Sequence, residues 1–153
     1  MPGFVAKKLC PELILVGSNF KNYSKESKFI MNIISEYDQN LSSHSLDEVY
    51  IDLTDYVFDK YSSEKSIDIT ELYMLPQLPE DIWNYAFTVV DMIRTRIFNE
   101  SQLTVSAGIA CNTLLAKVCT DINKPNGQFM VKGDRQEMLK FVCDIEVRKF
   151  PGV

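Results

Sequence analysis

The chain has 153 residues, of which 46% are hydrophobic and 24% are charged, so it is long enough for one domain with a real core but not for several. Its formal net charge of −5 has the wrong sign for a free-standing DNA-binding protein, because affinity for phosphate comes from Lys and Arg. Either DNA is not the partner, or the basic surface lies elsewhere. The sequence has neither a long apolar run nor a basic segment followed by an apolar one at its N-terminus. We therefore expect a soluble, intracellular protein without a membrane partner.

The four cysteines, Cys10, Cys111, Cys119 and Cys143, stand far apart without any Cys-x-x-Cys spacing. His44 is the only histidine that could join them. This pattern argues against a structural zinc site or a disulfide framework, and it favours a reducing compartment.

The first part of the sequence predicts two helices and a short strand. Residues 4–9 could form a short helix that stops at Pro11, and the apolar residues 13–16 could form a strand that Gly17 closes. Ser24 is a plausible N-cap for an amphipathic helix over residues 25–37, in which apolar side chains recur at helical spacing. We expect this helix to pack on a sheet as part of the core.

The stretch of residues 45–56 predicts a half-buried strand, because apolar and polar positions alternate from Val49 onward. Asp47 and Glu48 then sit at the entrance of the strand. Both carboxylates can serve one site only if the backbone turns there, since neighbours on a regular strand point to opposite faces. Two adjacent carboxylates at a strand end suit a divalent cation such as Mg²⁺. Taken alone, however, such a pair is more often solvated surface charge.

Residues 59–79 are polar and interrupted by prolines, which favours an exposed loop or a small insertion. The longest helix is predicted over residues 81–99, because Pro79, Glu80 and Asp81 form a favourable helix start and an apolar stripe follows. Residues 103–110 alternate as a second half-buried strand, with small residues on one face that would let another backbone or a ligand come close.

The C-terminal third predicts a helix, a turn, an edge strand and a last helix. Asn112 or Thr113 caps the first helix, and the turn at residues 124–127 ends it. Residues 128–131 form the edge strand. Asp134 and Glu137 make a capping box for the last helix, in which we expect three side chains to point inward: Met138, Leu139 and Val142.

Three stretches resemble the Y family of translesion DNA polymerases, and within it the polymerase kappa branch. The string Ser-Leu-Asp-Glu-Val-Tyr-Ile-Asp at residues 45–52 resembles the second metal-binding motif of the family. The block from Ser106 to Gln128, with its Lys-Pro-Asn-Gly turn, resembles the third conserved block. The Met-Pro-Gly-Phe start is similar to the end of the fingers subdomain. A nearly contiguous match of this length is far more specific than a four-letter motif. Cys111 stands where vertebrate kappa-type sequences have proline, and we expect it to be a buried, inert thiol.

The resemblance implies an α+β, ferredoxin-like polymerase palm that is incomplete at its N-terminus. We expect one antiparallel sheet of strands near 45–56, 103–110 and 128–131, covered on one face by the helices near 25–37 and 81–99. Residues 1–19 would be the end of the fingers. Residues 20–134 would be the palm, with a variable loop at about 59–79, and residues 135–153 would start the thumb as a truncated helix-hairpin-helix.

The implied function is that of a DNA-directed DNA polymerase, a nucleotidyltransferase that extends a primer opposite damaged template. Asp47 and Glu48 would be the catalytic carboxylates that bind Mg²⁺ or Mn²⁺, and Lys124 would contact the triphosphate of the incoming nucleotide. Without the resemblance, Lys124 would instead be a lysine that complements a helix dipole. The full-length protein would bind primer–template DNA and a deoxynucleoside triphosphate in the nucleus. A replication clamp is left open as a further partner.

The family's first catalytic aspartate, which bridges both metals, has no counterpart before Met1, and the fingers Tyr and Arg that bind triphosphate have none either. We therefore expect a fragment that is inactive alone. The alternative from another class is a non-catalytic interaction or regulatory module that keeps the palm. A palm used for nucleotide cyclisation is disfavoured, because the motifs of that chemistry are not seen. An Asp-Met-Asp-like strand encoded in frame upstream of Met1 would indicate an incomplete copy of a polymerase.

Overall fold

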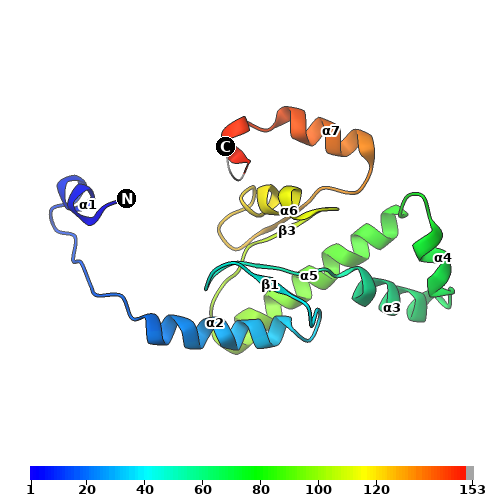
Figure 1. Cartoon of the computed structure of the whole chain (residues 1–153), viewed down its shortest axis with the longest axis horizontal. Helices are drawn as coiled ribbons and strands as arrows, with labels where there is room; N and C mark the ends of the chain where they lie inside the picture. The colour runs from blue at the N-terminus through cyan, green and yellow to red at the C-terminus, as the bar shows by residue number, and fades with distance from the viewer. Residues whose placement is uncertain (151–153) are drawn as a thin grey trace.

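The computed structural model describes residues 1–150 of the chain (Figure 1). The N-terminal half contains α1 (Gly3–Leu9), α2 (Phe20–Ile34), β1 (Ser42–Ser43), β2 (Val49–Tyr50), α3 (Thr54–Lys65) and α4 (Ile69–Met74). The C-terminal half contains α5 (Glu80–Ser101), β3 (Ala107–Ile109), α6 (Thr113–Thr120), β4 (Gln128–Met130), α7 (Arg135–Asp144) and the 3₁₀ helix η1 (Val147–Lys149). No helix within residues 1–150 is long and apolar enough to cross a membrane.

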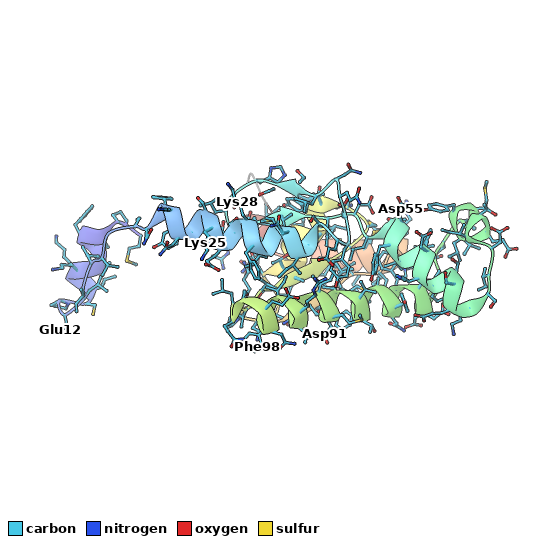
Figure 2. All side chains as sticks on the ribbon, turned by 90° about the horizontal axis from the view of Figure 1, so that it is seen from below. Glu12, Lys25, Lys28, Asp55, Asp91 and Phe98 are labelled. Atoms are coloured by element: carbon cyan, nitrogen blue, oxygen red, sulfur yellow. The ribbon has the colours of Figure 1, made fainter. Side chains whose placement is uncertain are left out.

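The long helix α5 is the element against which the rest of the molecule packs. Both α2 and α3 contact it, and the pair β3–β4 lies between α5 and α6 (Figure 1). In the view of Figure 2, α2 and α5 run side by side in front of the strands, with Asp91 and Phe98 on the exposed side of α5. The helix α1 extends away from this body at one end of the molecule (Figure 1).

The main hydrophobic core forms where α2, α3 and α4 meet α5. It contains ten buried residues: Ile33, Ile34, Val57, Phe58, Tyr61, Leu72, Ile82, Val89, Ile93 and Ile97. The apolar stripe predicted for the long helix supplies four of them, and Val90 is buried as well. The sequence therefore predicted both the extent of α5 and the face that it buries.

Two further predictions concerning α6 are confirmed. Asn112 is its N-cap, and the side chain accepts a hydrogen bond of 2.9 Å from the Leu115 N–H. The close approach expected at the small residues of the second strand occurs at Gly108, where an added Cβ would lie 2.0 Å from the Ala116 carbonyl oxygen. The strand β3 thus packs directly on the backbone of α6.

The α+β class is confirmed, but the arrangement of strands differs from the single antiparallel sheet that we expected. The structure has two separate two-stranded sheets within residues 1–150, and only β1–β2 is antiparallel. β3 and β4 are parallel, with Gly108 opposite Phe129. The physical reason is the connection: α6 crosses over between these strands, and a strand–helix–strand unit returns the second strand in the same direction.

The strand predicted over residues 45–56 is much shorter than expected. Only Val49 and Tyr50 are in β2, and α3 begins at Thr54. Asp52 helps to end the strand, because its carboxylate accepts a hydrogen bond of 2.9 Å from the Thr54 N–H. A carboxylate that binds backbone N–H groups favours the start of a helix over continued pairing in a sheet.

The prediction of an exposed loop at about 59–79 is wrong for most of this segment, because the segment contains the second half of α3 and all of α4. Tyr61 and Leu72 are buried against the core, although charged residues surround them in sequence. Asp68 caps α4 by accepting the Thr70 N–H at 2.9 Å.

Three smaller predictions also fail. Residues 13–16 form no strand, and Ile14 and Val16 are exposed. The first long helix begins four residues before Ser24 and is capped by Asn19, whose side chain accepts the Asn22 N–H at 3.2 Å. It also ends before Tyr37, at Ile34.

In α7, Asp134 caps the helix as predicted. Glu137 does not complete the capping box, because its carboxylate accepts from the Lys132 N–H. Leu139 and Val142 are exposed rather than inward. Cys111 is exposed as well, next to the Met138 sulfur, whereas Cys119 is the buried thiol. The last three residues of the expected thumb segment, 151–153, lie outside the described residues.

Candidate functional site

Asp47 and Glu48 lie in the turn between β1 and β2. The register pairs Ser43 with Val49, so residues 44–48 form the connection of a short hairpin. His44 donates its backbone N–H to the Glu48 carbonyl oxygen at 3.3 Å. The backbone therefore turns at the two acidic residues, which is the condition under which both carboxylates can serve one site.

The Asp47 side chain is exposed and is held by a local hydrogen bond. Its Oδ1 accepts from the Ser45 hydroxyl at 2.6 Å. This bond is the main reason why the pKa of Asp47 lies below its ordinary value. The positive charges of Lys117 and Lys124 lower that pKa further, as the smallest of the contributions.

Glu48 forms an ion pair with Lys117 on α6, in which the lysine Nζ donates to Oε1. The side chains of both residues are partly exposed. The hydrogen bond to Glu48 raises the pKa of Lys117 above its ordinary value. The pair joins the acidic turn to a helix that lies 69 positions later in the chain.

Lys117 was not singled out from the sequence, although it lies inside the block that resembles the polymerases. The spacing of Leu115, Val118 and Cys119 places these three residues on the buried face of α6 and leaves Lys117 on its margin. That position was readable from the sequence. The partner was not, because it depends on how α6 packs against the hairpin.

Lys124 lies in the turn that follows α6. Its Nζ is 2.6 Å from Oδ1 of Asp121, and both side chains are partly exposed. Lys124 is the largest influence on the Asp121 carboxyl and lowers its pKa. Asn126 has a positive φ of 50°, and a Cβ on Gly127 would lie 2.2 Å from the Asn123 carbonyl oxygen. The Lys-Pro-Asn-Gly sequence therefore fits a tight turn that another residue type at position 127 would disrupt.

The structure thus joins the acidic turn to α6 through Glu48 and Lys117, and it places Lys124 at the end of the same helix, paired with Asp121. The carboxylates of Asp47 and Glu48 come from the turn between β1 and β2, whereas Lys117 and Lys124 come from α6 and from the turn that follows it. Partly exposed charges of both signs in one place can bind a metal ion on the acidic side and phosphate oxygens on the basic side.

The donor set fits part of a magnesium site. Carboxylate oxygens are the ligands that Mg²⁺ prefers, and the ion usually takes one or two of them together with water and phosphate oxygens. Within residues 1–150 there is no group of three or more His, Cys, Asp or Glu side chains that could hold a metal. Asp47 and Glu48 would therefore supply two ligands, and the remaining positions would go to other groups.

The chain is similar to one known protein family and to several DNA polymerases. The impB/mucB/samB family matches residues 1–121. DNA polymerase kappa of Arabidopsis thaliana is 38% identical over 153 residues, which cover 100% of this chain and 20% of that protein. Human DNA polymerase kappa is 33% identical over 207 residues, and DNA polymerase IV of Shigella flexneri is 37% identical over 153 residues. The chain therefore spans between 20% and 36% of the length of these relatives.

Two solved structures are similar to the chain as well. DinB from Sulfolobus solfataricus has a TM-score of 0.75 at 24% identity, over 100% of this chain and 38% of that one, which shows a common fold. An insertion ternary complex of Dbh DNA polymerase has a TM-score of 0.73 at 25% identity with the same coverage.

Proposed function

Since the chain belongs to the impB/mucB/samB family of Y-family polymerases, we propose that it is part of a translesion DNA polymerase. In this role it contributes to nucleotidyl transfer onto a primer 3′ end opposite damaged template. The observation that carries the proposal is the ion pair of Glu48 with Lys117, which joins the acidic turn at Asp47 and Glu48 to the helix that ends before Lys124.

Asp47 and Glu48 are the residues that would hold Mg²⁺ or Mn²⁺. A bound divalent ion would supply charge stabilisation at the reacting oxygens, as in other phosphoryl-transfer enzymes. The hydrogen bond from Ser45 lowers the pKa of Asp47, which favours the ionised carboxylate that a cation requires. Glu48 has to exchange Lys117 for the cation, and Lys117 then remains beside the site as a positive charge.

Lys124 is the residue that would contact the triphosphate. Its ammonium group forms only a partly exposed pair with Asp121, a pair that contributes little on its own. A triphosphate carries more negative charge than a single carboxylate, so it can compete with Asp121 for this lysine.

The remaining parts of the proposal concern the longer protein. Residues 1–19 would be the end of the fingers, residues 20–134 the palm and residues 135–153 the start of the thumb. The complete protein would bind primer–template DNA and a deoxynucleoside triphosphate, and it would act in the nucleus. The relatives named polymerase kappa are eukaryotic, whereas those named polymerase IV are bacterial.

One observation favours a second candidate, a palm that acts as a non-catalytic module. Glu48 is already paired with Lys117, so one of the two carboxylates proposed as metal ligands has an internal partner. If that pair persists in the presence of Mg²⁺, the acidic turn is structural and the site has no catalytic role.

The test is a hybrid polymerase in which residues 1–153 replace the matching segment of the Arabidopsis relative. We expect primer extension by the hybrid and its loss in Asp47→Ala and Glu48→Ala. Lys124→Ala should lower kcat/KM for the nucleotide by a factor that corresponds to roughly 1 to 3 kcal/mol. Lys28→Ala, which removes an exposed lysine on α2 (Figure 2), is the matched control and should leave kcat/KM unchanged.

A folded hybrid that extends primers equally well with and without the two carboxylates would refute the proposed site. Unchanged kinetics with a lowered melting temperature in Lys124→Ala would assign this lysine to the helix end instead.

A further inference from the structure

Arg94, on α5, uses every N–H donor of its guanidinium. Arginine has five such donors, and five hydrogen bonds of Arg94 are present. Nε donates to the Val105 carbonyl oxygen at 3.0 Å, and Nη1 donates to Asp91 at 3.1 Å and to Gln128 at 3.2 Å. Nη2 donates to the carbonyl oxygen and to Oδ1 of Asn126 at 2.8 and 3.0 Å.

These bonds tie α5 to both ends of the unit that contains α6. Val105 lies just before β3, and Gln128 begins β4. Asn126 lies in the turn between α6 and β4, two residues after Lys124. One side chain therefore fixes the start of the crossover and the turn at its end with respect to the same helix.

The surroundings of Arg94 leave little freedom for this contact to rearrange. The Arg94 side chain is only 13% exposed, and Gln128 is buried. The Gln128 amide nitrogen also donates to the Phe87 carbonyl oxygen on α5 at 2.9 Å, while Asn123 donates to the Gln128 carbonyl oxygen at 2.8 Å. The turn at residues 124–127 is thus held both by hydrogen bonds between the residues that flank it and by hydrogen bonds to α5.

The neighbouring Arg96 offers a contrast on the same helix. Its guanidinium makes two bonds to Glu36 at 2.7 and 2.8 Å and one to Glu100 at 2.7 Å. These contacts join α5 to the end of α2 and to its own next turn. No hydrogen bond of Arg96 within the described part of the chain reaches the turn at residues 124–127.

We propose that Arg94 is a positioning residue that holds the Lys124 turn in the geometry needed to receive a triphosphate. The inference rests on the proposed function for its triphosphate, whereas the positioning itself rests on the five hydrogen bonds. Lysine cannot replace arginine here, because one ammonium group has three donors and no planar fork with which to reach Val105, Asn126 and Gln128 together.

The experiment uses the chain of residues 1–153 labelled with ¹⁵N, with inorganic triphosphate as the probe. Arg94→Met, Arg94→Lys and the matched control Arg96→Met are compared with the wild type. Two properties of the turn are measured: the amide shifts of residues 124–128, and the hydrogen-exchange protection of Ala107, whose N–H donates to the Gly127 carbonyl oxygen at 3.0 Å. Both Arg94 variants should shift these amides and lower the Ala107 protection. Arg96→Met should lower the melting temperature without either effect.

The second readout is the affinity for triphosphate from the same titrations. Arg94→Met should weaken it about two- to fivefold, because a displaced turn loses the charged contact of Lys124 with the phosphate oxygens. In the Lys124→Ala background the same substitution should have no further effect, because a residue that acts through Lys124 has nothing left to position.

The possible outcomes distinguish the positioning role of Arg94 from the triphosphate contact proposed for Lys124. If the Arg94 and Arg96 variants change the turn equally, or if Arg94→Lys preserves it, the positioning role is overturned. If the turn changes only in the Arg94 variants but Lys124→Ala leaves triphosphate affinity intact, the positioning of the turn stands and the proposed role of Lys124 fails. Additive losses of affinity in the double variant would overturn the claim that Arg94 acts through Lys124.

Discussion

Gly108 should tolerate no side chain, because β3 lies directly against the backbone of α6. A Cβ added at this position would lie 2.0 Å from the Ala116 carbonyl oxygen and 2.5 Å from the Thr120 nitrogen. Both are backbone atoms, so the helix itself would have to move by about 1 Å to restore ordinary van der Waals distances. Such a movement would loosen Leu115, Val118 and Cys119, which α6 buries. We expect Gly108→Ala to cost about 3 kcal/mol, at the upper end of the range for overpacking.

Urea and thermal unfolding would measure this cost, followed by circular dichroism and by the fluorescence of Trp83, the only tryptophan. A loss of that size corresponds to a fall in melting temperature of roughly 6 to 12 °C for a chain of this length. Gly17→Ala is the matched control, since nothing lies within 4 Å of a Cβ there, and it should stay within about 0.5 kcal/mol of the wild type. A free energy of unfolding for Gly108→Ala equal to that of Gly17→Ala would refute the close packing of β3 on α6.

Three further predictions concern activity, DNA and acid stability. Purified chain 1–153 should extend no primer, because two carboxylates without a third ligand position too little charge for phosphoryl transfer; incorporation that Asp47→Ala abolishes would contradict this. Binding to duplex DNA should be weak and should vanish at physiological salt, because the net charge is −5 and few phosphates can be neutralised; a complex that survives that salt in a gel-shift assay would overturn it. The pKa of Asp134 is lowered, mainly because its carboxylate accepts a hydrogen bond from the Glu137 N–H. Its contribution to stability should therefore be present above pH 3.8 and be lost as the pH falls through the folded-state pKa. Unfolding curves between pH 2 and 5 should show a smaller pH dependence for Asp134→Asn, which keeps a capping side chain, and an unchanged dependence would contradict the assignment.

The sequence predicted the elements whose local signals agree with their packing. Helix α5 was readable because Glu80 and Asp81 follow Pro79 and an apolar stripe continues to Ile97, so that start signal and periodicity point to the same structure. Helix α6 was readable for the same reason, from the Asn112 cap. The resemblance to a family added the candidate site residues, which no periodicity could have supplied.

The failures have physical causes that can be named. In α3, the buried residues Val57, Phe58 and Tyr61 are spaced as on a helix, but the charged residues between them suggested a loop. The alternation before α3 was real, since Val49, Ile51 and Leu53 all pack against the core, yet Asp52 ends the strand by binding a backbone N–H. Short-range pattern therefore identified the buried side chains better than it identified the backbone conformation.

Pairs between remote side chains could not be predicted at all. The contact of Glu48 with Lys117 and the five bonds of Arg94 depend on distances that only the packed structure defines. Arg94 appeared in the sequence as a residue outside the apolar stripe, a position that is usually solvated. Its donors are satisfied instead by carbonyl and side-chain oxygens of two segments that close over it.

Lys117 should compete with a divalent cation for Glu48. An ammonium group paired with one of two candidate ligands both blocks that carboxylate and repels a cation, so Lys117→Met should strengthen Mg²⁺ binding. Partly exposed ion pairs contribute up to about 1 kcal/mol, which limits the gain in affinity to roughly fivefold. From few protein ligands we expect the wild-type dissociation constant to be on the order of millimolar or weaker.

Isothermal titration with MgCl₂ at constant ionic strength measures the difference. Lys124→Met is the matched control, because it removes an identical charge whose own partner is Asp121, and its effect on Mg²⁺ affinity should be smaller. The Asp47→Ala, Glu48→Ala double variant should show no heat of Mg²⁺ binding. This result would establish that the ion binds at the acidic turn. If that double variant binds Mg²⁺ like the wild type, the acidic turn is not the metal site. If instead Lys117→Met and the wild type have equal dissociation constants while the double variant has lost binding, the ion does not displace Lys117, and Asp47 alone holds it.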